Sequence, residues 1–467
     1  MGFRVLRCFS LGIILPLVLT RCAAVDDFDK TRPGKPVLAP ANVQVLGLKE
    51  AGFPVPQPRA TSGVTMETAV RSALGWHPLL SEAAGRVRES GERITEAKAG
   101  YLPGVSGGVR SGYDGRRRAT GPKVELNAKQ VLYDFGKVAG SVQAGRAGEA
   151  LSRAQFLAAA DQLARDTAFS IIEVQRGRRL LDVSQRQING VAAIAKLVRE
   201  RTAGGASTES DQVQAASRLE AARSARLQYE MAYQRELTNL ANLTGTHAAP
   251  ADSVPAWLPQ ACNIAEPDWN SVPAIQVAVA HEERAAAMLN NHRAERFPTV
   301  SLEANAAYDL DDDRRRGERE VEYRVGVNVS APIYHGGASG ARLRAASHAL
   351  ESAGAARNNA RLSVKTGLQQ AGQQVSSLRR LRQSLASRKK LMARTRDLNR
   401  MQYVDLGTRS LLNLLDAEKE LHDTELLAVN AEYDLRRLYV TCLYNSGKIR
   451  ERFGIDAMAL RPGLSKP

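Results

Sequence analysis

The sequence predicts a mainly helical fold with a smaller membrane β component, in which one unit of two strands and two long helices occurs twice. Long stretches without proline are rich in alanine, arginine and leucine, while aromatic residues make up only 5% of the 467 residues. That balance suits long helices better than a large globular core. Proline and glycine gather at a few places, and short segments beside them alternate with the period of two that is typical of strands.

A fixed offset of 202 residues relates the two halves of the chain. Gly205 matches Gly407, Gly245 matches Gly447, and each pair bounds a helical stretch. Self-similarity at a fixed offset indicates a repeat architecture. The predicted segments, in chain order, are a signal peptide (1–24), an extended proline-rich N-terminal arm (25–62), repeat 1 (63–245), a linker (246–271), repeat 2 (272–447) and a C-terminal tail (448–467) without a periodic signal.

The first 24 residues have the pattern of an export signal. Arg4 and Arg7 precede an apolar run that ends near Thr20, and this order predicts removal from the cytoplasm. Cys22 follows a sequence similar to a bacterial lipobox, although Arg21 stands where a small residue is expected. Lipidation of Cys22 and ordinary cleavage near Ala24 are therefore both open.

Four short segments are predicted to be membrane strands. No later stretch has the roughly 18 to 20 apolar residues of a membrane-spanning helix, so any crossing must use strands of about ten residues. The alternating segments are about 105–114, 123–132, 300–309 and 323–333. Soluble hairpins are the alternative for each pair. Because four strands cannot enclose an aqueous lumen, the membrane interpretation requires several chains to share one barrel.

The strands are accompanied by long helices. Residues 65–99 are expected to form one helix before the first strand, and at about 1.5 Å per residue a proline-free stretch of some 66 residues would extend about 100 Å. The long helices are predicted at 137–203, 208–243, 340–406 and 410–445. In the last one, residues such as Leu414 and Leu421 form a coiled-coil seam with spacings of three and four. Glu418 and its charged neighbours are assigned to the opposite faces.

Composition also limits the function. The formal charge of +16 is spread along the helices, so we interpret it as solvated faces and channel walls rather than as a nucleic-acid site. The chain has neither a phosphate-binding loop nor a His-Glu-x-x-His motif, and we predict no enzyme activity, cofactor or metal site. Cys262 and Cys442 could pair in an oxidising compartment, or Cys442 could be a buried thiol.

The order of these elements resembles the TolC family of outer-membrane channel proteins. The resemblance covers about residues 60–450 and is carried by Tyr-Leu-Pro at 101–103, Leu-Tyr-Asp-Phe-Gly at 132–136 and the stretch at 407–418. The last motif is most similar to the branch that serves type I secretion, with drug or metal efflux as the alternative. The resemblance implies a homotrimer in the Gram-negative outer membrane, whose twelve-stranded β-barrel continues as a helical coiled-coil barrel across the periplasm. It further implies a periplasmic adaptor, an inner-membrane transporter and an equatorial position for the linker.

The resemblance also implies two sets of site residues. The helix turns at Gly204, Gly205 and Gly407 would form a periplasmic entrance. The gate residues implied there are Ser210, Asp211, Arg409, Asn413 and Asp416. An Arg–carboxylate pair suits a latch of modest strength, whereas the simpler interpretation is that these residues only decorate helix starts. Asn413 departs from an acidic position of the family, so the ring would carry less charge.

Aromatic residues follow both return strands. Tyr133, Phe135 and Tyr334 are expected at the interface between hydrocarbon and water, or alternatively in an ordinary core. Outside the channel class, a periplasmic adaptor or a structural coiled-coil protein would explain the helices. Neither would explain the paired strands between prolines.

Overall fold

The computed structural model describes residues 63–114, 119–247, 249–263, 266–310 and 321–455, all within the unit Val55–Pro467. The predicted signal peptide (1–24), Cys22 and the N-terminal arm (25–62) lie outside the described residues. The elements in chain order are α1 (Met66–Trp76), α2 (Pro78–Ala99), β1 (Gly104–Asp114), β2 (Ala119–Tyr133), α3 (Lys137–Ala203), α4 (Glu209–Thr244), the short 3-10 turn η2 (Leu258–Gln260), α5 (Pro273–Ala294), β3 (Thr299–Asp309), β4 (Val321–Ser330), α6 (Ala338–Val404), α7 (Leu411–Asn445) and α8 (Ile449–Arg452). This is the predicted mainly helical fold with a β component.

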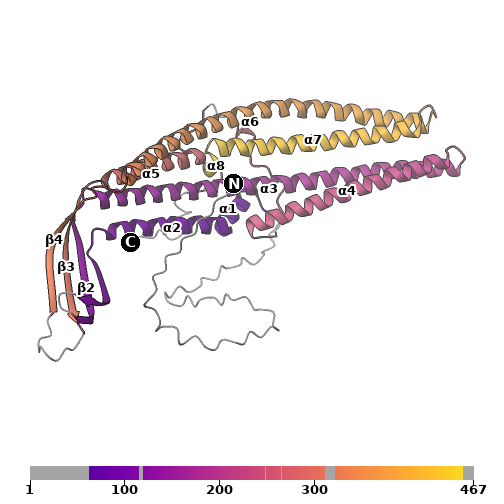
Figure 1. Cartoon of the computed structure of the whole chain (residues 1–467). Coiled ribbons are helices and arrows are strands. Elements are labelled where there is room, and N and C mark those ends of the chain that lie inside the picture. Colours follow the sequence, from indigo (N-terminus) through magenta and orange to yellow (C-terminus); the bar gives the residue numbers. More distant parts are fainter. Residues whose placement is uncertain (1–62, 115–118, 248, 264–265, 311–320, 456–467) are drawn as a thin grey trace, which may run out of the picture. The chain divides into compact units, whose positions relative to one another are not determined.

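The long helices form two antiparallel hairpins, α3 with α4 and α6 with α7 (Figure 1). Their bounds lie within two residues of the predicted stretches, which is the usual uncertainty of helix ends. Each hairpin turns at a left-handed glycine, Gly205 with φ +73° and Gly407 with φ +61°. Only glycine adopts this conformation without steric cost. The hairpins pack together mainly through α3 and α7.

The helix predicted over residues 65–99 is divided in two. His77 has extended dihedral angles (φ −67°, ψ 130°) and separates α1 from α2, which starts at Pro78. The proline ring disfavours a helical conformation in the preceding residue. The prediction of one helix was wrong because it overlooked Pro78 inside an otherwise regular apolar pattern.

The four strands form one antiparallel sheet in the order β1-β2-β3-β4. Strand β2 starts at Ala119, four residues before the predicted strand, because its first residues continue to pair with the end of β1. Strand β4 covers Val321–Ser330 instead of the predicted 323–333. Pro332 follows its end and has no N–H group for a ladder, and the Ile333 side chain beyond it is 97% exposed.

The register sorts apolar and polar side chains onto opposite faces of the sheet. Val109, Val124, Tyr308 and Val321 are successive partners across all four strands, and they form an apolar row. The neighbouring row on the other face joins Arg110 to Lys123. Because side chains alternate along a strand, the same separation extends over the whole sheet.

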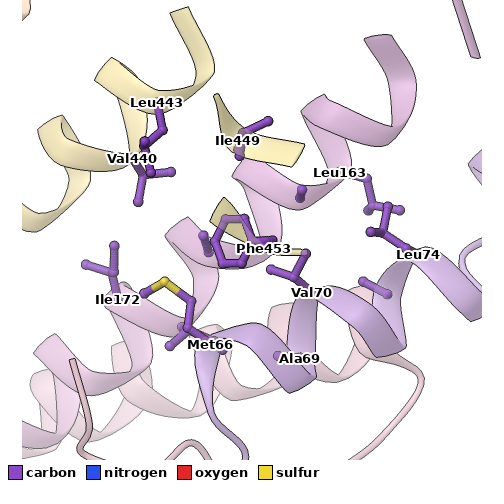
Figure 2. Close-up of a cluster of buried hydrophobic side chains, with 14 of the residues drawn as sticks. Met66, Ala69, Val70, Leu74, Leu163, Ile172, Val440, Leu443, Ile449 and Phe453 are labelled. Atoms are coloured by element: carbon purple, nitrogen blue, oxygen red, sulfur yellow. The ribbon is translucent and has the colours of Figure 1, made fainter. Parts of the chain in front are cut away.

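The main apolar core joins elements from both ends of the chain. Met66 and Val70 of α1 pack with Ile172 of α3, Leu443 of α7 and Phe453 beyond α8 (Figure 2). The start of the tail is therefore part of the core, although its sequence shows no periodic signal. The helix α8 in this tail is a single turn, and its apolar residues are too few to show a helical period.

Two further contacts hold the ends of the fold together. Cys262 in the linker and Cys442 in α7 form a disulfide, which resolves the two alternatives left by the sequence. Nε of Arg450 in α8 lies 3.1 Å from Oδ1 of the fully buried Asp161 in α3. Both contacts connect residues that are far apart in the sequence.

Among the residues described, no helix has the length and apolar character that a membrane-spanning helix requires.

Candidate functional site

The turn between α3 and α4 is organised by a capping box. The hydroxyl of Thr208 accepts a hydrogen bond from the backbone N–H of Asp211 (3.1 Å), and the Asp211 carboxylate accepts one from the N–H of Thr208 (3.2 Å). The Ser207 hydroxyl donates to the same carboxylate (2.9 Å). Hydrogen bonds from Ser207 and then from the Thr208 backbone hold the pKa of Asp211 below its ordinary value. Asp211 is therefore an anion that also caps its own helix.

The turn between α6 and α7 has an equivalent helix cap, but an asparagine stands where the first turn has its capping aspartate. Ser410 stands 202 residues after Thr208, and its hydroxyl accepts from the backbone N–H of Asn413 (3.4 Å). Asn413 occupies the position equivalent to Asp211 but supplies no carboxylate. Beside it, Nε of Arg409 donates to the side-chain oxygen of Gln402 (3.1 Å).

The two turns contact each other through residues that the gate assignment did not include. Arg201 at the end of α3 donates to the carbonyl oxygen of Val404 (3.2 Å), and its guanidinium lies 4.9 Å from the ring centre of Tyr403. The Tyr403 hydroxyl lies 3.5 Å from the hydroxyl of Ser207. Tyr403 is buried, so these contacts fasten one turn to the other by a cation–π interaction and hydrogen bonds.

An apolar cluster and an ion pair continue the contact below the turns. Val198, Ala215, Leu411 and Leu414 pack in one cluster that contains all four helix ends and Tyr403. Further along, Nη2 of Arg218 in α4 lies 3.4 Å from Oδ1 of Asp416 in α7. Both side chains are about half exposed, so this pair is worth little by itself in water.

The structure brings the predicted gate residues to the same end of the hairpins but does not join them as the resemblance implied. Within one protomer, and for the residues described, no hydrogen bond or ion pair links Arg409 to Asp211, and the exposed Ser210 has no partner. Asp211 is instead engaged by Ser207 and Thr208. Of the two residues at the family's acidic positions, Asp416 pairs with Arg218, while the described contacts of Asn413 involve its backbone.

The repeat offset holds a signal for the residues that were missed. Applying the 202-residue offset to the turns aligns Arg201 with Tyr403 and Ser207 with Arg409. When equivalent positions of the two repeats carry side chains that can attract each other, a contact between the repeats is expected there. Arg218 has no such signal, because its partner Asp416 is not at the equivalent position.

The aromatic residues lie where the sheet meets the long helices. Phe135 has φ +55°, and its ring stacks on Phe297 at a centroid distance of 5.7 Å and contacts Tyr133 edge-on at 4.7 Å. The Asp134 carboxylate beside it accepts hydrogen bonds from the N–H groups of Gly136 and Val138 and so caps α3. Tyr334 is 80% exposed at the matching place in the second repeat. Tyr133, Phe135 and Phe297 therefore form an exposed aromatic group, and Tyr334 is exposed as well.

The described part of the chain contains no group of three or more histidine, cysteine, aspartate or glutamate side chains that could hold a metal ion.

The sequence model of one protein family, described as "Outer membrane efflux protein", matches residues 69–246 and 270–441. The chain belongs to this family. The two matched segments fall on the two repeats, and the predicted resemblance is confirmed. Members of the family are outer-membrane channels and not enzymes, so the chain is an outer-membrane protein of the efflux-channel class. This excludes the periplasmic-adaptor and structural coiled-coil interpretations.

Individual relatives of the outer membrane efflux protein family agree with this assignment. The chain is 24% identical to the outer membrane efflux protein BepC of Brucella suis over 84% of its own length and 86% of BepC. It is 26% identical to the outer membrane protein TolC of Salmonella enteritidis, but that match spans only 33% of the chain and 30% of TolC. The crystal structure of the outer membrane protein VceC from Vibrio cholerae superimposes with a TM-score of 0.71 at 17% identity, covering 82% of this chain and 96% of VceC. That likeness shows the fold.

Proposed function

We propose that three copies of this chain form one export channel, with a shared β-barrel in the outer membrane and a tunnel of helices in the periplasm. The observation that carries the proposal is the sheet, whose described strands leave β1 and β4 at its edges. An open edge of unpaired N–H and C=O groups cannot face hydrocarbon. Strand β1 of one copy and β4 of the next would satisfy each other, and three such junctions would close twelve strands.

The two faces of the sheet support this arrangement. The apolar row through Val109 and Val124 would face lipid, and both side chains are well exposed in the single chain. The opposite face carries ion pairs, Arg110 with Glu125 (3.3 Å) and Lys129 with Glu303 (3.0 Å), which suit a water-filled lumen. Alternation of lipid-facing and lumen-facing residues is the pattern of outer-membrane barrels.

The helical hairpins support several copies as well. Because α3 and α7 make the main contact between the hairpins, α4 and α6 lie on the flanks of the protomer. Both flanks expose large apolar side chains, among them Leu227 and Met231 of α4 and Leu362 and Leu391 of α6. Isolated exposed leucines need no explanation, but rows of them along both flanks favour burial against neighbouring copies.

Cargo and partners form the second half of the proposal. We infer that the tunnel works with a periplasmic adaptor and an inner-membrane transporter, and that it exports proteins by type I secretion. The support for protein export is the motif at 407–418, which resembles that branch. Efflux of drugs or metals is the second candidate, because the matching family and the relative BepC are both described as outer membrane efflux proteins.

Crosslinking in living cells would separate these candidates. After crosslinking, the chain is purified through a tag and its partners are identified by mass spectrometry. An adaptor and an ATP-driven transporter encoded with a large exported protein would support type I secretion. A proton-driven transporter of small molecules would support efflux instead, and recovery of neither partner would contradict the tripartite proposal.

A further inference from the structure

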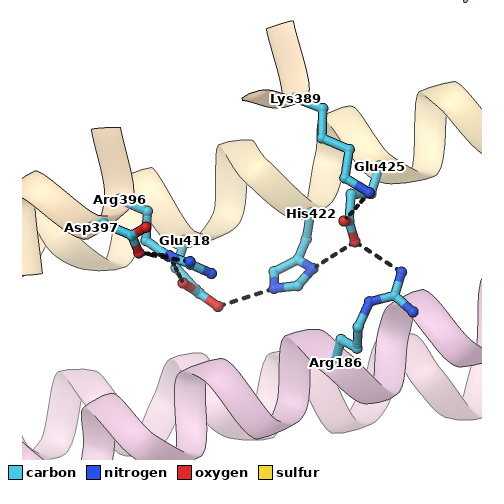
Figure 3. Close-up of polar contacts among 7 residues, drawn as sticks. All are labelled: Arg186, Lys389, Arg396, Asp397, Glu418, His422 and Glu425. Carbon is cyan, nitrogen blue, oxygen red and sulfur yellow. Dashed lines mark hydrogen bonds and ion pairs between the residues drawn. The ribbon is translucent and has the colours of Figure 1, made fainter. Parts of the chain in front are cut away.

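A buried cluster of charged side chains lies where α7 packs between α3 and α6 (Figure 3). Its centre is formed by Glu418, His422 and Glu425 of α7, whose side chains are 4%, 5% and 10% exposed. Spacings of four and three residues place all three on one face of the helix. Glu418 was assigned to a solvated face from the sequence, and the structure shows that this was wrong.

The neighbouring helices supply the opposite charges. From α3, Arg186 lies 3.1 Å from the Glu425 carboxylate, and from α6, Lys389 lies 2.7 Å from its other oxygen. Arg396 of α6 lies 3.8 Å from Glu418 and also pairs with its own neighbour Asp397. With a neutral histidine, the three cations and three carboxylates of this cluster balance.

The ring of His422 lies between two carboxylates. Its Nε2 is 3.0 Å from Oε1 of Glu418, and its Nδ1 is 3.6 Å from Oε2 of Glu425. A neutral imidazole has one N–H donor and one lone pair, so it would direct the lone pair at a carboxylate. The protonated ring donates a hydrogen bond from Nε2 to Glu418 and directs its second N–H group toward Glu425, with which it forms an ion pair. The geometry therefore fits the imidazolium form.

A glycine in the facing helix makes room for this arrangement. A Cβ atom built on Gly190 of α3 would lie only 1.8 Å from the Glu418 carboxylate oxygen. Any other residue at position 190 would displace that carboxylate from His422. Gly190 and His422 lie on different helices, so the close approach is an observation independent of the ring's own contacts.

We propose that one proton held by His422 fastens α7 to α3 and α6, so that the packing of the second hairpin against the first is controlled by pH. The proton gives both ring nitrogens an N–H group, so that the one ring presents positive charge to Glu418 and to Glu425 at the same time. Without this proton, the lone pair of one ring nitrogen faces a carboxylate in a buried site. This repulsion lowers the stability of the packing of α7 against its neighbours. This control is separate from the proposed cargo and partners.

The direction of the pH dependence follows from the protonation. Burial lowers the pKa of His422, but the hydrogen bond to Glu418, the close contact with Glu425 and the charges of both carboxylates outweigh it, so the pKa of His422 lies above its ordinary value. The packing contribution is therefore complete below the unfolded-state pKa and is lost as the pH rises through the folded-state pKa. The hairpins should hold together in mild acid and loosen in mild alkali.

Hydrogen exchange on the intact detergent-solubilised protein tests the proposal. After correction for intrinsic exchange, protection of the α7 amides around residues 418–425 should fall by up to tenfold for each pH unit above the folded-state pKa. Exchange of the C2 hydrogen of the His422 ring, followed in the same peptides over days, gives its pKa directly. We expect that pKa above the ordinary value of a histidine side chain.

Two variants provide the comparison. His422→Gln cannot take up the proton, so the fall of α7 amide protection with rising pH should disappear. His348→Gln should keep this fall. If His422→Gln fails to assemble, Glu418→Gln keeps the side-chain shape and should move the fall to lower pH. A His422 pKa at or below the ordinary value of a histidine, or the same pH-dependent fall in His422→Gln, would overturn the proposal.

Discussion

The backbone of Gly190 lies close to the Glu418 carboxylate. A Cβ atom added at Gly190 would lie only 1.8 Å from Oε1 of Glu418. Gly190 lies within α3, where a glycine normally costs stability. We therefore expect Gly190→Ala to destabilise the protein by about 1–3 kcal/mol, because overpacking exceeds the gain in helix propensity. The midpoint of thermal unfolding followed by circular dichroism measures this.

Gly148 provides the matched control on the same helix. It also lies within α3, but a Cβ there meets nothing within 4 Å. Gly148→Ala should therefore raise stability by about 0.5–1 kcal/mol. Equal effects at positions 148 and 190 would show that Glu418 moves aside without cost.

Arg201 is expected to hold the two helix turns together. Arg201→Ala removes both the cation–π contact with Tyr403 and the hydrogen bond to the Val404 carbonyl, so the two turns should separate more readily. Single-channel conductance in planar bilayers should rise. Arg199→Ala, two residues earlier and exposed, should leave conductance unchanged. Equal conductance in the unmodified protein and both variants would show that Arg201 does not hold the turns together.

Arg409 belongs to the predicted latch, although within the protomer it contacts Gln402. If it pairs with Asp211 of a neighbouring copy, Arg409→Ala should raise conductance, and Asp211→Asn should do so to a similar extent. The double variant should then add little to either single change. Additive effects would mean that the two side chains act separately, and unchanged conductance would exclude Arg409 from the latch.

Asp161 should make the stability of the core depend on pH. Burial raises the pKa of Asp161 to about 7, although the charge and hydrogen bond of Arg450 oppose this. A carboxyl whose folded-state pKa is raised binds more protons when folded, so its contribution falls as the pH rises from about 4 to 7. Asp161→Asn should lose less stability than the unmodified protein between pH 5 and pH 8. Parallel pH profiles would contradict the raised pKa.

The disulfide between Cys262 and Cys442 closes a loop of 180 residues. By the chain-entropy estimate, such a crosslink contributes up to about 5 kcal/mol. In denaturant without reductant, neither cysteine should react with an alkylating reagent, and both should react after reduction. The Cys262→Ser, Cys442→Ser double variant should unfold at a lower temperature, and immediate alkylation of the untreated protein would show free thiols.

The sequence was sufficient for features that depend on local chemistry. The long helices follow from stretches without proline that end at left-handed glycines such as Gly205 and Gly407, and the strands follow from period-two alternation. Local rules failed where a single residue interrupts a regular pattern, as Pro78 and Pro332 do. These interruptions were present in the sequence but were given too little weight.

Contacts between distant residues were not predictable in the same way. A division of the helix into an apolar and a charged face places Glu418 in solvent. Such a division takes no account of Arg396 and His422 or of the space left by Gly190. The ion pair of Arg218 with Asp416 likewise joins residues 198 apart that are not at equivalent positions of the repeats. Such pairs depend on how the two hairpins meet, and that is decided by the whole fold.

In the proposed trimer, one chain supplies only part of the channel wall. Native mass spectrometry of the protein extracted from outer membranes in mild detergent tests it most directly. We expect a single species with the mass of three chains, which resists detergent until it is heated. A species with the mass of one chain, stable in water without detergent, would contradict the shared barrel.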